Sequence, residues 1–250
     1  MSVALISVNG LWKAFGEKEV LRGIQLEIPE GTTFVVLGAS GSGKTVLLKH
    51  VIGLLKPDRG NVTVDGTDVS ALSGRELTEA RRVFGMVFQG AALFDSMTVF
   101  DNVAFPVRER ERRIPHDELR SRVVESLRVV DLGDDVLALW PSQLSGGMRK
   151  RVALARALVA NPRIVLYDEP TTGLDPITTN SVDSMILQAK QRRGVTSMVI
   201  SHDIASAFRV ADRLAVLYDG RIAAQGTPEE VRRSDDPYVQ RFLSLWFEKQ

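Results

Sequence analysis

The segment from Gly38 to Thr45, which reads Gly-Ala-Ser-Gly-Ser-Gly-Lys-Thr, constrains the fold of this chain more than any other feature. It matches the pattern G-x-x-x-x-G-K-T, follows the apolar run at 34–37 and precedes apolar residues at helical spacing. Glycines allow backbone N–H groups to converge on phosphate oxygens at the positive end of a helix. A strand, a phosphate-binding loop and a helix in this order predict an α/β fold with a parallel sheet.

The residues of this loop have distinct expected roles. We expect Lys44 to reach the β and γ phosphates of a nucleotide and Thr45 to bind Mg²⁺ through its hydroxyl. The alternative is a glycine-rich turn that binds nothing, which the flanking strand and helix disfavour. The residues predicted to surround the phosphates are Gly38, Ala39, Ser40, Gly41, Ser42, Gly43, Lys44 and Thr45.

Composition excludes several classes of function. The 250 residues include no cysteine, so disulfide scaffolds, thiolate zinc sites and cysteine nucleophiles are ruled out. The 32 Lys and Arg residues balance 31 Asp and Glu residues, so no overall positive field predicts a nucleic-acid partner. No stretch approaches the roughly 20 apolar residues of a membrane span, and residues 1–18 are typical of a first strand rather than a signal peptide. Any role at a membrane is therefore expected to come from a partner.

Two adjacent carboxylates, Asp168 and Glu169, directly follow a second apolar strand. Ligands of parallel sheets bind at the carboxyl ends of the strands, so these acids are expected near the nucleotide. Successive side chains of a strand diverge, so the two can act differently: Asp168 holds Mg²⁺, while Glu169 orients and deprotonates the attacking water. The alternative is a charged turn after a buried strand.

A second anion site is predicted at 144–148, which reads Leu-Ser-Gly-Gly-Met before a long helical run. Ser145, Gly146 and Gly147 place a hydroxyl and free N–H groups at a helix start, where a phosphate can bind. The alternative is an ordinary helix cap. Elsewhere the pattern is helical from about 90 to 160, and apolar runs predict strands at 5–8, 24–28, 34–37, 61–64, 164–167, 196–200 and 214–217.

Together these motifs resemble the ATPase subunits of ABC transporters, from about Leu5 to Arg233. The resemblance implies an α/β P-loop NTPase fold of the ABC-ATPase type, with a RecA-like core, an N-terminal antiparallel β-subdomain and an inserted helical subdomain. Within one domain (1–250), it implies a nucleotide-binding core with the β-subdomain, a helical subdomain carrying the 144–148 loop, and a C-terminal helical tail. The core with the β-subdomain is expected at 1–89 and 161–233. The helical subdomain is expected at 90–160, and the C-terminal tail at 234–250.

The same resemblance assigns further site residues. Phe15 matches the aromatic that stacks on adenine, with Trp12 as a nearby competitor, and Gln89 matches the glutamine that touches Mg²⁺ and the water. Asp175 matches the loop at the dimer seam, and His202 matches the histidine that senses the γ-phosphate. The alternatives are a core position for Phe15, a strand end for Gln89, a turn for Asp175 and a helix start for His202.

A mechanism and partners are also implied. Two copies are expected to face head to tail, with each ATP held between the Lys44 loop of one copy and the Ser145 loop of the other. Hydrolysis with Lys44, Mg²⁺, Gln89, Glu169 and His202 then lets the dimer open and reset permease subunits in the membrane. A soluble member acting on ribosomes or DNA is disfavoured, because the chain carries a single ATPase unit and no coiled-coil insertion.

Three features resemble the Mla-type branch of these ATPases, which moves phospholipids with MCE-domain partners: the segment 88–106, Met148 and the positions 175–178. Ala91 stands where this branch often carries glycine. The resemblance implies attachment to the cytoplasmic face of the inner membrane, an apolar groove for a permease helix, an MCE-domain protein and, in some systems, a small regulatory subunit. An importer of amino acids or another small solute is the alternative.

Three remaining features are interpreted structurally. His50 and His116 are expected to have structural roles, and the charged run 108–113 is expected to be a solvated face rather than a site for acidic lipid. The apolar stripe at 238–247 is expected to pack on its own domain or on a neighbouring subunit.

Overall fold

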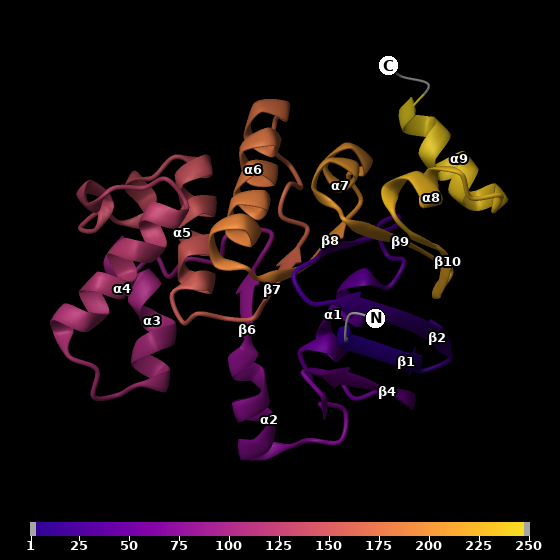
Figure 1. Cartoon of the computed structure of the whole chain (residues 1–250), viewed down its shortest axis with the longest axis horizontal. Helices are drawn as coiled ribbons and strands as arrows, with labels where there is room; N and C mark the ends of the chain where they lie inside the picture. The colour runs from indigo at the N-terminus through magenta and orange to yellow at the C-terminus, as the bar shows by residue number, and fades with distance from the viewer. Residues whose placement is uncertain (1–3, 248–250) are drawn as a thin grey trace. The chain divides into compact units, whose positions relative to one another are not determined.

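The computed structural model describes residues 4–247, which form two compact units. The first unit contains the described residues up to Arg82 and those from Thr196 onward, and the second contains Val83–Val195. Figure 1 shows the strands and helices of both units along the chain. Among residues 4–247, no helix combines the length and apolar character needed to cross a membrane.

An antiparallel sheet forms the N-terminal part of the first unit. Its order is β2-β1-β4-β5, and its strands are β1 (Ala4–Phe15), β2 (Lys18–Pro29), β4 (Arg59–Val64) and β5 (Thr67–Asp68). The antiparallel β-subdomain is thus confirmed. Its first two strands are much longer than the apolar runs at 5–8 and 24–28 predict, because register shifts interrupt the pairing of β1 with β2 and hide the alternation.

The first unit also contains a mostly parallel layer. The strand β3 (Thr33–Leu37) is buried along its whole length and pairs in parallel with β8 (Thr196–Ser201) and β9 (Arg213–Tyr218). β10 (Arg221–Gly226) pairs antiparallel with β9. The helices of this unit are α1 (Lys44–Val51), α2 (Gly74–Ala80), α7 (Ile204–Val210), α8 (Pro228–Arg232) and α9 (Pro237–Phe247).

The second unit joins two parallel strands to four longer helices. β6 (Phe84–Val87) pairs with β7 (Ile164–Asp168), and α5 (Gly146–Leu158) contacts α3, α4, α6 and β6. The helical content predicted for 90–160 is confirmed, with short 3₁₀ turns at Asp134–Val136 and Pro141–Gln143. The other helices are α3 (Val99–Arg110), α4 (His116–Val129) and α6 (Pro176–Arg193).

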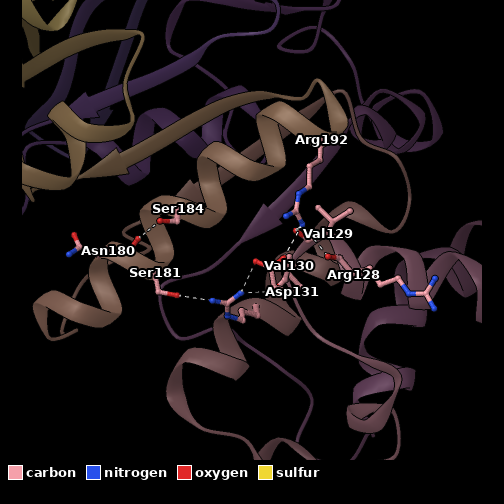
Figure 2. Close-up of polar contacts among 9 residues, drawn as sticks. Arg128, Val129, Val130, Asp131, Asn180, Ser181, Ser184 and Arg192 are labelled. Atoms are coloured by element: carbon pink, nitrogen blue, oxygen red, sulfur yellow. Dashed lines mark hydrogen bonds and ion pairs between the residues drawn. The ribbon is translucent and has the colours of Figure 1, made fainter.

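Two arginines hold the end of α4 (Figure 2). Arg151 of α5 donates to the carbonyl oxygen of Val130 at 2.6 Å and to Ser181 Oγ at 3.0 Å. Arg192 of α6 donates to the carbonyl oxygen of Val129 at 2.8 Å and to Asp131 Oδ1 at 3.1 Å. Because these bonds link α4, α5 and α6, the helical part of this unit is cross-connected by polar contacts as well as by its apolar core.

The C-terminal helix α9 packs on its own unit. Val239 and Leu243 are 0% and 3% exposed, and the Tyr238 ring stacks on Tyr218 with centroids 3.5 Å apart. The side chains of Leu245, Trp246 and Phe247 and all of residues 248–250 lie outside the described part. Of the two arrangements expected for the tail, the described side chains favour packing within the domain.

Leu243→Ala is therefore expected to lower the free energy of unfolding by about 3 kcal/mol, since it removes buried methyl groups and leaves a cavity. Denaturant unfolding of the full chain measures the change. The matched control is Gln240→Ala, which alters an exposed residue of the same helix and is expected to have little effect. Equal stability of the two variants, with loss of a dimer only in Leu243→Ala, would instead place α9 against a neighbouring copy.

Candidate nucleotide-binding site

The loop between β3 and α1 requires glycine at several positions. Gly41 and Gly43 have φ angles of 81° and 104°, which side chains of L-residues rarely adopt. A Cβ atom on Gly38 would lie 2.5 Å from the carbonyl oxygen of Leu217, so no larger residue fits there. The backbone is thus shaped by glycine in the manner that a phosphate-binding loop requires.

Lys44 and Thr45 occupy the first turn of α1, as predicted. Lys44 is only 5% exposed, and its Nζ donates to the carbonyl oxygens of Gly38 at 2.8 Å and Ala39 at 3.1 Å. Gly43 is the residue before the helix, and as a glycine it has no side chain that could cap it. A helix start of this kind attracts phosphate oxygens.

His202 lies at the same sheet edge as this loop. Leu37, the last residue of β3, pairs with Ser201, the last residue of β8, so Gly38 and His202 leave two neighbouring parallel strands together. His202 is exposed and precedes Asp203, which caps α7 by accepting from the Ser206 N–H. The position therefore allows either the nucleotide-sensing role or the helix-start alternative.

Phe15 ends β1 and is 49% exposed, so its ring is available for stacking rather than buried in the core. Lys13 Nζ lies 5.6 Å from the centre of that ring. Trp12 is half-buried, and its indole nitrogen lies 3.2 Å from where a Cβ on Gly23 would stand. The tighter packing of Trp12 supports the choice of Phe15 as the adenine-stacking residue.

In the second unit, Gln89 and the two carboxylates leave one edge of the β6–β7 pair. Val87 pairs with Tyr167, so the segments beginning at Phe88 and Asp168 emerge side by side. Gln89 is exposed, and Asp168 and Glu169 are half-buried. Glu169 has a φ of 52°, and its Oε2 accepts a hydrogen bond from Thr172 Oγ1 at 2.9 Å.

Ser145 and Asp175 both begin helices. Ser145 caps α5 by accepting from the Met148 N–H at 3.2 Å, which leaves exposed Gly146 at the helix start. Asp175 caps α6 by accepting from the N–H groups of Ile177 and Thr178 and from the Thr178 hydroxyl. The Thr178 hydroxyl and these N–H groups lower the pKa of the Asp175 carboxyl. Ser145 thus has the helix-cap role named as its alternative, whereas Asp175 caps a helix instead of occupying the turn named as its alternative. The roles of both residues toward a nucleotide stay predictions.

Two buried cations of α5, Lys150 and Arg156, were missed by the sequence reasoning. Arg156 donates to the carbonyl oxygens of Ala91 at 2.9 Å and Ala92 at 2.7 Å, two residues with φ angles of 64° and 49°. Ala91 therefore adopts the backbone that a glycine would favour, and Arg156 holds it there. The sequence signal that could have identified these two residues is a cation among the Val, Ala and Leu residues of an apolar helix.

An apolar groove of about 380 Å³ lies beside Arg156 in the second unit. Its lining is mostly apolar and includes the large side chains of Phe84, Met86, Phe88, Phe94, Phe105 and Pro106, and Arg110 and Arg156 add two cations. Phe88 and Phe94 are 42% and 41% exposed. Phe88, Phe94, Phe105 and Pro106 come from the segment 88–106, where the sequence predicts a groove for a partner helix, whereas Phe84 and Met86 belong to β6.

The remaining predictions concern charge and histidine. In the run 108–113, Arg108 pairs with Asp101 and Glu111 with Arg122, each at 2.8 Å, which fits a solvated mixed-charge face. His50 is 1% exposed, and burial lowers its pKa. His116 has an exposed side chain. All three features fit the structural interpretation.

These observations define a class of protein. In the first unit, a glycine-shaped loop with a buried lysine at a helix start fits the phosphates of a nucleoside triphosphate. In the second unit, the two acids at the end of β7 are residue types that nucleotide hydrolysis uses. No cluster of three or more His, Asp or Glu side chains suited to a metal exists among residues 4–247. Mg²⁺ would instead rely on hydroxyl, amide and single carboxylate oxygens together with phosphates and water, as is usual for this ion. The class is a P-loop nucleotide hydrolase.

Comparison with known proteins gives the family. The model of the family described as "ABC transporter" matches residues 21–172. A solved dimeric structure of the ATP-binding cassette MJ0796, in a post-hydrolysis state bound to ADP and Pi, superimposes with a TM-score of 0.79 and 34% identity. It covers 89% of this chain and 98% of that one. The chain therefore belongs to the ABC transporter family, as an ATP-binding and ATP-hydrolysing domain.

Three curated relatives differ in their described cargo. A probable ribonucleotide transport ATP-binding protein of Mycobacterium bovis is 44% identical over 96% of this chain, which spans only 66% of that protein. The MlaF protein of an intermembrane phospholipid transport system from Haemophilus influenzae is 40% identical over 97% of this chain and 91% of its own length. A methionine import ATP-binding protein, MetN, of Escherichia coli O157:H7 is 40% identical over 96% of this chain and 70% of its own length.

Proposed function

We propose that this chain is the ATPase subunit of an ABC transporter that moves phospholipids between membranes. The observation that carries the proposal is the 40% identity to the Haemophilus influenzae phospholipid-transport protein, which this chain matches over 91% of that protein's length. In this arrangement the chain is attached to the cytoplasmic face of the inner membrane through permease subunits. The phospholipid is handled by the complex rather than by this chain.

Each candidate residue has a part in nucleotide hydrolysis. Phe15 stacks on the adenine, while Lys44 and the N–H groups of 38–45 hold the phosphates. Glu169 orients the attacking water and accepts its proton, and His202 stabilises charge on the transferred phosphoryl group. Thr45, Gln89 and Asp168 supply the oxygen donors for Mg²⁺, which when bound neutralises charge on the phosphates.

The functional unit is a head-to-tail homodimer. Ser145, Gly146 and Gly147 stand at the exposed start of α5 and bind the nucleotide held by the other copy, with Asp175 near the seam. The solved MJ0796 cassette, described as dimeric, supports this arrangement. ATP then joins the two copies, and its hydrolysis allows them to separate.

The apolar groove supports a permease partner. Its aromatic lining fits the apolar face of a short helix, and Arg110 can interact with acidic or carbonyl oxygens of that helix. An MCE-domain protein and, in some systems, a small regulatory subunit complete the assembly that the resemblance implies. A permease that co-purifies with the chain tests this partner directly.

The cargo is tested by purifying the tagged chain with the membrane subunits that accompany it, and identifying the bound lipid by mass spectrometry. In proteoliposomes, ATP is expected to drive transfer of a fluorescent phospholipid, while ADP and the Glu169→Gln variant are not. Stimulation of ATP hydrolysis by phospholipid, but not by amino acids, would support the proposal. Transfer that proceeds equally with ADP would contradict it.

An importer of a small solute is the second candidate, and the 40% identity to the methionine import protein favours it. In that case the co-purified permease would carry no phospholipid. ATP hydrolysis would then rise with a binding protein loaded with an amino acid and stay unchanged with phospholipid vesicles.

A further inference from the structure

Lys150 is a buried cation in the second turn of α5, the helix that begins at the Ser145 cap. Its side chain is 8% exposed and shares a small cavity lining with apolar residues, among them Leu154, Tyr167 and Ile186. This burial lowers its pKa. A buried ammonium is unfavourable unless hydrogen-bond acceptors surround it, so the partners of Lys150 identify what it holds.

Those partners are two main-chain oxygens on two different loops. Lys150 Nζ donates to the carbonyl oxygen of Gln89 and, at 3.0 Å, to that of Pro170. Gln89 follows β6 and Pro170 follows β7, and these two strands are paired. One ammonium group therefore connects the loop that carries Gln89 with the residue next to Glu169.

The backbone at Glu169 needs such support. Its φ of 52° lies in the left-handed region, which is unfavourable for a residue with a side chain. A conformation of this kind persists when neighbouring contacts impose it. The bond from Lys150 holds the following residue, Pro170, and the bond from Thr172 Oγ1 holds the carboxylate itself.

We propose that Lys150 is a positioning residue for ATP hydrolysis, which holds the Gln89 loop and the Glu169 backbone in the arrangement that the reaction requires. It acts through main-chain oxygens and does not touch the nucleotide. The proposal rests on the proposed roles of Gln89 and Glu169. It also ties both of them to α5, the helix whose start carries the Ser145 loop.

The test uses the full chain purified with its membrane subunits. Lys150→Met keeps an unbranched side chain that is one heavy atom shorter and removes both hydrogen bonds. It is expected to lower kcat roughly 10- to 100-fold, since small displacements of a catalytic group have effects of this size. The KM for ATP is expected to change less than about threefold, because the phosphate-binding loop is left intact. Lys150→Arg retains a donor for each carbonyl and is expected to recover kcat to within about threefold of the parent.

Two control variants separate positioning from general support of the fold. Arg151→Met removes the neighbouring cation, which bonds to Val130 and Ser181 instead, and is expected to lower the melting temperature while leaving kcat within about twofold. Arg120→Met removes an exposed cation of α4 and is expected to change neither quantity. Hydrogen exchange of the full chain adds a measurement that does not depend on activity. Lys150→Met is expected to speed amide exchange at 89–92 and 169–174, whereas Arg151→Met is expected to leave the exchange rates of these segments unchanged.

Each outcome has a defined meaning. A Lys150→Met variant that melts at a lower temperature but keeps its kcat and its exchange rates in both loops would overturn the proposal, as would an equal loss of kcat in Arg151→Met. Failure of Lys150→Arg to recover activity would also count against it. Glu169→Gln is measured in parallel: if that variant retains turnover, the assigned role of Glu169 is wrong, and the exchange data still report whether Lys150 orders the two loops.

Discussion

Replacing Glu169 with glutamine is expected to lower ATP turnover by about 10²- to 10⁴-fold, the range attributed to a positioned general base. Glutamine has nearly the same shape as glutamate, and its amide can keep a contact with Thr172, so the backbone at 169 is expected to persist. The amide cannot accept the proton of the attacking water. Steady-state ATP hydrolysis by the chain with its membrane subunits measures the loss.

The same variant is expected to accumulate as an ATP-bound dimer, because binding is intact while hydrolysis is blocked. Size-exclusion chromatography with ATP and then with ADP shows the trapped species. Glu109→Gln, which neutralises an exposed glutamate of α3 in the same unit, is the matched control and is expected to hydrolyse ATP normally. Parental turnover in Glu169→Gln would reject Glu169 as the base.

Lys44→Ala is expected to lower ATP turnover by about 10²- to 10³-fold. Removing one preorganised hydrogen-bond donor that stabilises developing charge in a transition state has an effect of this size. Affinity for ATP is expected to fall at least about tenfold, because a hydrogen bond to a charged group contributes about 1.5–3 kcal/mol. Binding of a fluorescent ATP analogue and steady-state hydrolysis measure the two effects separately.

Lys49→Ala is the control for this substitution, since it removes an exposed lysine of the same helix. Lys44 is buried against the carbonyl oxygens of Gly38 and Ala39, so a melting curve is needed to show that the variant remains folded. A folded Lys44→Ala chain that binds and hydrolyses ATP like the Lys49→Ala chain would exclude the predicted contact with the phosphates.

The bounds of β3, β7, β8 and β9 follow closely from the sequence, whereas those of β1 and β2 do not. β3 and β8 are buried on both faces, so they appear as continuous apolar runs that periodicity detects. β1 and β2 extend well beyond their apolar segments, because bulges break the alternation along the pair. The two predicted boundaries of the helical subdomain, at 90 and 160, remain predictions.

For the candidate site, motif spacing identifies the residues, and the fold shows which of them lie near one another. Gly38, Lys44 and His202 could be named from sequence, but only the pairing of Leu37 with Ser201 places the loop and the histidine at one strand edge. The resemblance predicts Asp175 at a dimer seam, which stays a prediction, while the structure gives it the cap of α6. Local hydrogen bonds of this kind depend on backbone angles that a residue pattern does not specify.

The sequence by itself determined which segments are candidates for the chemistry of this protein: a glycine-rich loop before a helix, a pair of acids after a strand and a Ser-Gly-Gly helix start, each made by neighbouring residues. Only the tertiary structure decided what holds those pieces in place. Lys150 and Arg156 lie 61 and 65 positions from Gln89 and Ala91, whose carbonyl oxygens they bind. No short-range pattern encodes such contacts, because a buried cation is matched to its acceptors only after the strands have paired and α5 has packed against them.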